Sequence, residues 1–434
     1  MDLLLLLIAI CCLNIPRYHH WFIVIVVAFC CKFFYIFRAL DQIPFLIPTN
    51  LWDGALILLV ISLFTFKFKE ANKQNLRYRS LEKYVTYFLA FVTIIGVVDL
   101  IISINTSLID FIKISRHWYL LLYIFVFPHF SKESIRKAIT IIFFIVSVLS
   151  VDMVIESLTN IYILTPPPVM TYTDGILVMR GAFPIPYSQF FIISLIAGAF
   201  NIKNKYRWPL VFFLIASCIV SITRSVALGI LLFTTMYYFL LNRNNLKSIF
   251  YIFLIGLFAL LFINYIPGLG ERFLETKNEF AMSSSGEVEG SATFRLLLTK
   301  ERINYLMEDA FRFTFGIGNI SENNFPNIFH IGLIQENGIV AQTYSGDIAW
   351  PNLFLRLGFC GTLLYLILIF GYLRIFTQNS HYKLALGAFC MFSVNIFFNS
   401  FSSSNISTAT FWVFPLLIGC YMSYKKEYNE EIIL

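Results

Sequence analysis

The sequence contains few charged residues. Only 13% of its 434 residues are Asp, Glu, Lys or Arg, whereas soluble globular chains carry roughly 25%. At the same time 58% of the residues are hydrophobic, and the mean hydropathy is +0.76. Too few polar residues remain to cover a water-soluble core of this size. The composition therefore excludes a cytoplasmic enzyme, a secreted disulfide scaffold and a disordered chain, and it indicates a polytopic membrane protein.

The sequence also lacks motifs that hold metals, disulfides or nucleotides. Its eight cysteines all lie in apolar segments, and none has Cys-x-x-Cys spacing, so no zinc site, iron–sulfur cluster or disulfide framework is expected. No Walker loop, His-Glu-x-x-His or Gly-x-Ser-x-Gly sequence occurs, which leaves ATPases, zinc proteases and serine hydrolases without support. Basic residues form no stripe interleaved with aromatics, so we expect no nucleic-acid partner.

Twelve apolar segments approach or exceed the length of a membrane-spanning helix, which needs about 20 residues. The loops that would share one side are rich in Lys and Arg, and by the positive-inside rule this side is the cytoplasm. We therefore expect about 12 transmembrane helices, and residues 2–14 offer a thirteenth. The predicted spans are 20–37, 51–66, 84–104, 115–130, 138–155, 188–202, 208–223, 225–241, 248–266, 351–373, 382–400 and 407–424.

Charge is distributed unevenly along the chain. Residues 267–350 hold six basic and eleven acidic residues, whereas the whole chain has a net charge of +7. We expect this large loop on the periplasmic side, between N-terminal transmembrane helices in 1–266 and C-terminal ones in 351–434. A second, proline-rich outward loop is expected at about 156–187. Within the large loop, 293–313 mixes apolar and charged positions, which predicts an amphipathic helix near the membrane surface.

Five residues on this outer side are candidates for chemistry. Arg224 stands alone in a long uncharged stretch, and an arginine in hydrocarbon costs at least ~2.5 kcal/mol unless it meets a partner or water. Arg295 and Arg302 are seven residues apart, which places them on one helical face. Arg180 lies in the proline-rich loop, and Asp347 precedes a predicted span. Each also has an ordinary explanation: a snorkelling arginine, a solvated helix face, a solvated loop residue or a helix cap.

Guanidinium groups that converge at the outer membrane surface would suit a diphosphate ligand. The planar fork of arginine binds phosphate oxygens bidentately and never loses its charge. At an effective dielectric constant near 20, one such charge about 4 Å from a phosphate is worth roughly 4 kcal/mol. Two or three could stabilise a diphosphate leaving group, and a carboxylate such as Asp347 could accept a proton from a sugar hydroxyl.

Four short segments follow one another in a set order. They are Arg180-Gly181 followed by Phe183, Pro184 and Pro186; Thr223 to Gly229; Arg295 with Gly316-Ile317-Gly318-Asn319; and Asp347 through Gly358 and Gly361. Together they resemble the bacterial O-antigen polymerases and O-antigen ligases, a superfamily of membrane glycosyltransferases, over roughly residues 175–425. Ligases usually have a histidine where this chain has Asp347, which favours a polymerase. Either Arg295 or Arg302 could match the family's arginine.

The resemblance implies an all-α polytopic protein of the bacterial inner membrane with a GT-C-like outer face. It implies an enzyme of lipopolysaccharide biosynthesis that polymerises polyprenyl-diphosphate-linked oligosaccharide repeat units at the periplasmic face. Arg180, Arg224 and Arg302 would bind the diphosphate, and Asp347 and Arg295 would be catalytic. No cofactor or metal is implied. Membrane lipids and the lipid-linked oligosaccharides would be the partners, with a chain-length regulator as a further candidate.

Two other functions remain open from the sequence. The first is an O-antigen ligase that transfers finished polymer to the lipid A core. The second is a non-enzymatic transporter or flippase for lipid-linked sugars. A transporter would carry charged residues in mid-membrane and paired half-repeats, whereas the predicted spans are nearly free of charge apart from Asp152 and a few residues at their edges.

Overall fold

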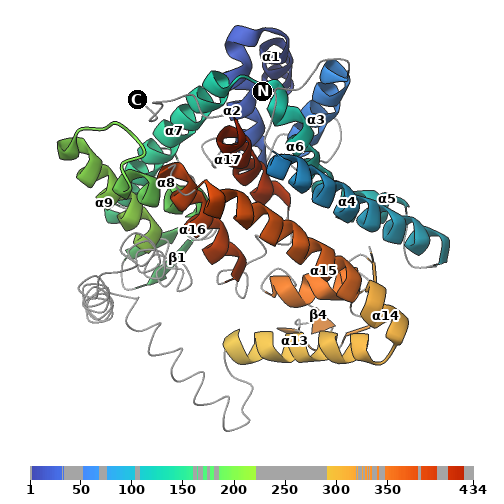
Figure 1. Cartoon of the computed structure of the whole chain (residues 1–434). Coiled ribbons are helices and arrows are strands. Elements are labelled where there is room, and N and C mark those ends of the chain that lie inside the picture. The colour runs from blue at the N-terminus through green and yellow to red at the C-terminus, as the bar shows by residue number, and fades with distance from the viewer. Residues whose placement is uncertain are drawn as a thin grey trace.

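In the computed structural model the chain is mostly helical, and its helices pack side by side (Figure 1). The structure describes residues 2–31, 33, 52–67, 76–102, 108–159, 164, 170–173, 176–179, 185–220, 291–318, 320, 325, 328–329, 331, 333–334, 340–341, 348–379, 383–397 and 409–424. The α-helices there are α1 (Asp2–Asn14), α2 (His19–Cys30), α3 (Asp53–Phe66), α4 (Leu76–Ile102), α5 (Leu108–Ser115), α6 (Tyr123–Val126), α7 (Lys132–Thr159), α8 (Ile185–Ile196), α9 (Asn204–Val220), α13 (Ser291–Met307), α14 (Ala310–Phe315), α15 (Ala349–Gln378), α16 (Lys383–Phe397) and α17 (Val413–Ser423).

Short 3-10 helices and two hairpins complete the described elements. The 3-10 helices are η1 (Pro16–Tyr18), η4 (Arg116–Leu122), η5 (Phe127–His129) and η9 (Ala409–Trp412). The antiparallel hairpins pair β1 (Met170–Thr173) with β2 (Ile176–Met179), and β3 (Leu333–Ile334) with β4 (Val340–Ala341). The expectation of an all-helical chain did not include these hairpins, and both fall in the two predicted outward loops.

Three helices are long and apolar enough to cross a membrane, counted over the described residues. They are α4 over Tyr78–Ile101, α7 over Lys132–Glu156 and α15 over Ala349–Gln378. Five further apolar helices in the same part of the chain are shorter. The protein therefore has the helices of a membrane protein, as its composition predicts. The number of twelve spans stays a prediction, and two of them, 225–241 and 248–266, lie outside the described residues.

The predicted span at 115–130 has a different structure from a regular membrane helix. It consists of η4, the four-residue α6 and η5 in succession. Pro128 lies in the first turn of η5, where its missing N–H removes a helical donor. The Tyr123 hydroxyl donates to the Ala55 carbonyl of α3 at 2.7 Å. This segment is thus a buried, tightly wound connection between α5 and α7.

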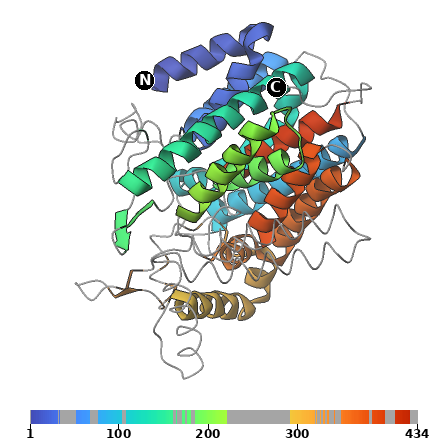
Figure 2. The same cartoon turned by 90° about the vertical axis from the view of Figure 1, so that its left-hand side faces the viewer.

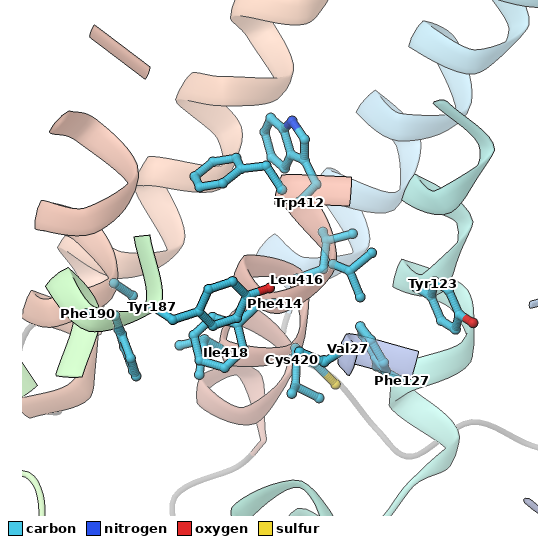
Figure 3. Packing of buried hydrophobic residues seen from close by; sticks show 14 of the residues in the cluster. Val27, Tyr123, Phe127, Tyr187, Phe190, Trp412, Phe414, Leu416, Ile418 and Cys420 are labelled. Atoms are coloured by element: carbon cyan, nitrogen blue, oxygen red, sulfur yellow. The ribbon is translucent and has the colours of Figure 1, made fainter. Parts of the chain in front are cut away.

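Helix α17 lies inside the main hydrophobic core, and all of its residues are buried. Figure 3 shows its side chains, among them Phe414 and Ile418, surrounded by residues of other helices such as Val27. The rings of Phe414 and Tyr187 of α8 have centroids 4.6 Å apart. Just before α17, the Trp412 indole N–H donates to a tyrosine hydroxyl of α15 at 2.8 Å. The chain's last described helix therefore joins the first half of the chain to the second.

Two helices that could cross a membrane, α4 and α15, pack closely because glycines remove side chains from their interface. The space beside Gly361 holds the Phe91 ring, and the space beside Gly371 holds the Tyr84 ring. Small residues allow this close approach between membrane helices. Since the later glycine of α15 meets the earlier ring of α4, the two helices are antiparallel. The start of α4 lies beside the end of α15.

Basic segments that were predicted to share one side lie together. Lys132, at the start of α7, has its Nζ 5.9 Å from the centroid of the Tyr421 ring near the end of α17. His129 stacks on Phe66 at the end of α3, with ring centroids 4.6 Å apart. The start of α7 therefore meets the end of α17, and η5 just before it meets the end of α3.

The remaining described basic segments are adjacent to this end. Gly198, between α8 and α9, has both Arg207 and Lys383 next to the space where its side chain would be. Lys383 begins α16, which follows the end of α15. Helix α13 lies across the opposite end of the molecule, far from the N-terminus in both views (Figures 1 and 2). Helix α13 and the described basic segments thus occupy opposite ends, and which end faces the cytoplasm stays a prediction.

Candidate functional site

Three of the five candidate residues, Arg180, Arg224 and Asp347, lie outside the described residues. Two of them directly follow or precede described elements. Strand β2 ends at Met179, one residue before Arg180, and contacts α7. Helix α15 begins at Ala349, two residues after Asp347. The structure therefore tests the predicted convergence only for the residues of α13.

Helix α13 has one buried face and one exposed face. Leu298, Arg302 and Leu306 are buried and follow one another at helical spacing. Arg295 lies on the same face one turn before Leu298 and is half-buried. On the other face, Lys300 is exposed. The predicted amphipathic helix is therefore present, but its apolar face contacts protein.

The buried face of α13 packs on a small core that is separate from the main one. This second core consists of Leu306, Ile317, Phe325, Phe329 and Leu355. Glu301, also on α13, accepts a hydrogen bond from the Ile331 backbone N–H at 3.1 Å. The described residues of the large loop thus pack together around the start of α15 and have a core of their own. We refer to α13, α14 and the described residues from 316 to 331 as the outer module.

Arg302 is buried in the outer module. Its side chain is 1% exposed, its Nη1 donates to the Leu298 carbonyl at 3.2 Å, and its guanidinium carbon lies 5.2 Å from the centroid of the Phe329 ring. A guanidinium in this position packs against the protein and is shielded from molecules outside it. This placement favours Arg295 over Arg302 as the residue that meets a ligand.

The stretch 293–313 forms two helices, which corrects the expectation of one. α13 ends at Met307, and α14 begins at Ala310. Asp309 has extended backbone geometry and caps α14, because its carboxylate accepts from the N–H groups of Phe311 at 2.7 Å and Arg312 at 3.4 Å. These backbone hydrogen bonds hold the pKa of Asp309 below its usual value. A side-chain cap is a strong signal for a new helix start.

The segment after α14 hydrogen-bonds to α15 at a point where that helix is interrupted. Gly358 has φ +60° and ψ −167°, which interrupts the helix. A helix end leaves its last four carbonyl groups without partners in the helix. The backbone N–H of Ile317 donates to the Leu355 carbonyl at 2.8 Å, and the N–H of Gly318 donates to the Arg356 carbonyl at 3.0 Å. Two carbonyls beside the break are thereby satisfied by the outer module.

Glycine is required on both sides of this contact. A Cβ at Gly316 would lie 2.4 Å from the Arg356 carbonyl oxygen, and a Cβ at Gly358 would lie 2.3 Å from the Gly316 nitrogen. Both residues also have positive φ. The Gly-Ile-Gly sequence that carries part of the family resemblance therefore has a physical role: it lets two backbones touch.

Sequence reasoning missed two charged residues at this contact. Asp99 of α4 has its carboxylate against Gly318, since a Cβ there would lie 1.4 Å from its Oδ2. Arg356 of α15 donates from Nη1 to the Ile320 carbonyl at 3.1 Å, and its guanidinium carbon lies 5.5 Å from the centroid of the Phe325 ring. Each is the lone charged residue of a predicted span, and an intramembrane charge is itself a signal of function.

Trp350, three residues after Asp347 in the sequence, has a structural partner. Its indole N–H donates to the Ile396 carbonyl near the end of α16 at 3.0 Å. The start of α15 is therefore fixed to α16 as well as to the outer module. Among the described residues no group of three or more His, Cys, Asp and Glu side chains is placed to hold a metal ion.

The sequence matches no protein-family model, and comparison with curated proteins likewise gives no match. The resemblance to O-antigen polymerases and ligases therefore rests on the short segments quoted above.

Proposed function

We propose that this protein is a membrane glycosyltransferase that joins polyprenyl-diphosphate-linked oligosaccharide repeat units at the periplasmic face of a bacterial inner membrane. The observation that carries the proposal is the contact between the outer module and α15. It brings Arg295 on α13 to the same end of the molecule as the start of α15, which Asp347 precedes by two residues. This end lies opposite the described basic loops.

The proposed reaction uses the arginines for the leaving group and the carboxylate for the acceptor. The acceptor hydroxyl oxygen attacks the anomeric carbon of the donor, and the bond from that carbon to the diphosphate oxygen breaks. The hydroxyl proton passes to Asp347, and the electron pair leaves with the diphosphate. Arg295, together with Arg180 and Arg224, neutralises the charge that develops on the diphosphate.

Arg302 has a positioning role in this proposal. Its guanidinium is buried between Leu298 and Phe329, so it stabilises the inner face of α13 on which Arg295 also lies. Asp99 and Gly318 likewise fix the outer module to the membrane helices. In this proposal Arg295 contacts the ligand, whereas Arg302 and Asp99 hold the outer module in place.

A reconstituted assay tests the proposal. Purified protein in lipid nanodiscs is mixed with lipid-linked repeat units, and products are separated by size on a gel. We expect a ladder of polymer, abolished by Arg295→Ala and by Asp347→Asn. Lys300→Ala is the matched control, because Lys300 is on the exposed face of the same helix, and it should leave the ladder intact.

Other results would point elsewhere. A ladder that survives Arg295→Ala at normal protein level would remove this arginine from the mechanism. Transfer of finished polymer to lipid A core, without growth of the chains, would indicate a ligase. Movement of the units across the bilayer without a new glycosidic bond would indicate a transporter.

A further inference from the structure

One face of α15 is apolar and exposed along its length. Phe359, Leu363, Ile367 and Phe370 are all exposed, with Phe359 at 51% and Phe370 at 57%. Their spacing of three or four residues places them on one side of the helix. Because α15 is long and apolar enough to cross a membrane, this stripe is its lipid-facing side.

Helix α14 extends the stripe sideways near the start of α15, beside the interruption at Gly358. The Phe313 ring stacks on the Phe359 ring, with centroids 6.0 Å apart and planes 11° apart, and it meets the Phe354 ring edge-on at 5.6 Å. Phe313 remains 38% exposed and Phe311 57% exposed. An aromatic surface therefore continues from the membrane helix onto α14, which lies in the large loop between the predicted spans.

We propose that α14 is an aromatic foot that lies in the outer leaflet of the bilayer, at the boundary between headgroups and acyl chains. The occupant of this surface is bilayer lipid. Helices that lie at this depth bury Phe, Trp and Leu side chains at the boundary between headgroups and acyl chains, and keep charged side chains on their other face. The Arg312 side chain, whose Nε lies 3.5 Å from an Asp309 carboxylate oxygen, and whose guanidinium carbon lies 4.1 Å from the centroid of the Tyr305 ring, supplies charge at headgroup height.

The exposed face of α13 also carries an apolar side chain, and it differs from the aromatic surface of α14 in its surroundings. Leu296 is 64% exposed, but it lies on the same outward face as Lys300 and Asn304, opposite the buried Leu298. This face points away from the side of α13 that packs against the second core, and the exposed side chains of Lys300 and Asn304 on it are polar. Exposure of an apolar side chain in the outer module is therefore not sufficient for lipid contact; continuity with the α15 stripe is the distinguishing feature.

The aromatic foot would also set the height of the outer module. The sequence from α14 runs directly into Gly316, whose backbone touches the break in α15. The aromatic foot would be held at the headgroups, and the backbone after it is hydrogen-bonded to α15 beside Gly358. These two attachments leave α13 little freedom to move along the membrane normal. This inference requires that the protein spans a membrane with the outer module on the outer side, and it requires no glycosyl transfer, so it stands or falls separately from the proposed reaction.

Photochemical cross-linking to lipid tests the proposal. The photoreactive analogue p-benzoylphenylalanine replaces Phe313 or Phe311 in separate full-length variants, held in nanodiscs of phosphatidylethanolamine and phosphatidylglycerol without polyprenyl lipids. After irradiation, mass spectrometry measures the fraction of protein that carries a lipid adduct. The analogue at Leu363 is the positive control, and the analogue at Leu296 is the control for exposure alone.

We expect lipid adducts at positions 311 and 313 several-fold above those at 296 and comparable with those at 363. Equal adduct fractions at 313, 311 and 296 would overturn the proposal. Position 311 is the safeguard for folding, because Phe311 is the more exposed of the two rings and its replacement disturbs less packing.

Discussion

The carboxylate of Asp99 occupies the space that a side chain at position 318 would need, and residue 318 is glycine. A Cβ at position 318 would lie 1.4 Å from Oδ2 and 2.2 Å from Cγ of Asp99. Two parts of the chain that are more than two hundred residues apart are therefore fitted to each other. The outer module is attached to α4 by this contact and to α15 by the hydrogen bonds of Ile317 and Gly318.

Replacement of Gly318 by alanine should detach the outer module. The new methyl group collides with Asp99, and the position has φ +71°. Gly198→Ala is the matched control. Gly198 has φ +70°, but a Cβ there would lie 3.4 Å from its nearest neighbour, Nη1 of Arg207, which is an ordinary contact distance. We expect Gly198→Ala to cost about 1–2 kcal/mol from backbone strain alone, and Gly318→Ala to cost clearly more, measured by thermal unfolding in detergent.

A second substitution separates collision from strain at this site. Asp99→Ala removes the atoms that a methyl group at position 318 would meet. In the Gly318→Ala background it should recover part of the lost stability, although Asp99→Ala alone destabilises the protein. If the effects of the two substitutions simply add, the collision is not the cause.

Gly358→Ala should weaken the same attachment from the side of α15. The added Cβ would lie 2.3 Å from the Gly316 nitrogen and 2.6 Å from the Phe315 carbonyl carbon. We expect limited proteolysis to cut the outer module faster, while α15 stays protected within the membrane. Gly419→Ala, whose Cβ would be 3.3 Å from Tyr372, serves as the control and should leave the cleavage pattern unchanged.

Long apolar segments were the predictable part of this fold. The span predicted at 138–155 lies within α7, and that predicted at 351–373 lies within α15. Long runs of hydrophobic residues permit few structures other than a helix in a membrane. The β1–β2 hairpin was also within reach, because Thr173 pairs with Ile176 and the two residues between them are Asp-Gly, a typical hairpin pair.

Tertiary contacts were beyond the reach of the sequence. The long run of apolar residues predicted a continuous helix over 351–373, whereas Gly358 interrupts the helix where Gly316 packs against it. The same spacing that put Arg295 and Arg302 on one face could not tell which was buried, since burial depends on Phe329 and Leu298 around it. Asp99 went unnoticed because its role comes from a glycine far along the chain.

Arg302 should matter for stability in a way that Lys300 does not. Truncation of this buried side chain by Arg302→Ala leaves a cavity beside Phe329 and removes the hydrogen bond to the Leu298 carbonyl. We expect a loss of about 2–4 kcal/mol, seen as a lower midpoint of thermal unfolding, against no measurable change for the exposed Lys300→Ala. Equal effects of the two substitutions would mean that Arg302 is exposed in solution.

The cap of α14 should make the foot sensitive to acid. The pKa of Asp309 is lowered in the folded protein, mainly by hydrogen bonds from the backbone N–H groups of Phe311 and Arg312. Its contribution to stability is therefore present above the pKa of the unfolded chain and is lost as the pH falls through the lowered pKa of the folded state. Hydrogen exchange of those two amides, corrected for the intrinsic rate at each pH, should accelerate across this acidic range. Asp309→Ala should expose the amides at every pH, whereas Glu308→Ala, one residue earlier and outside the cap, should leave their protection unchanged.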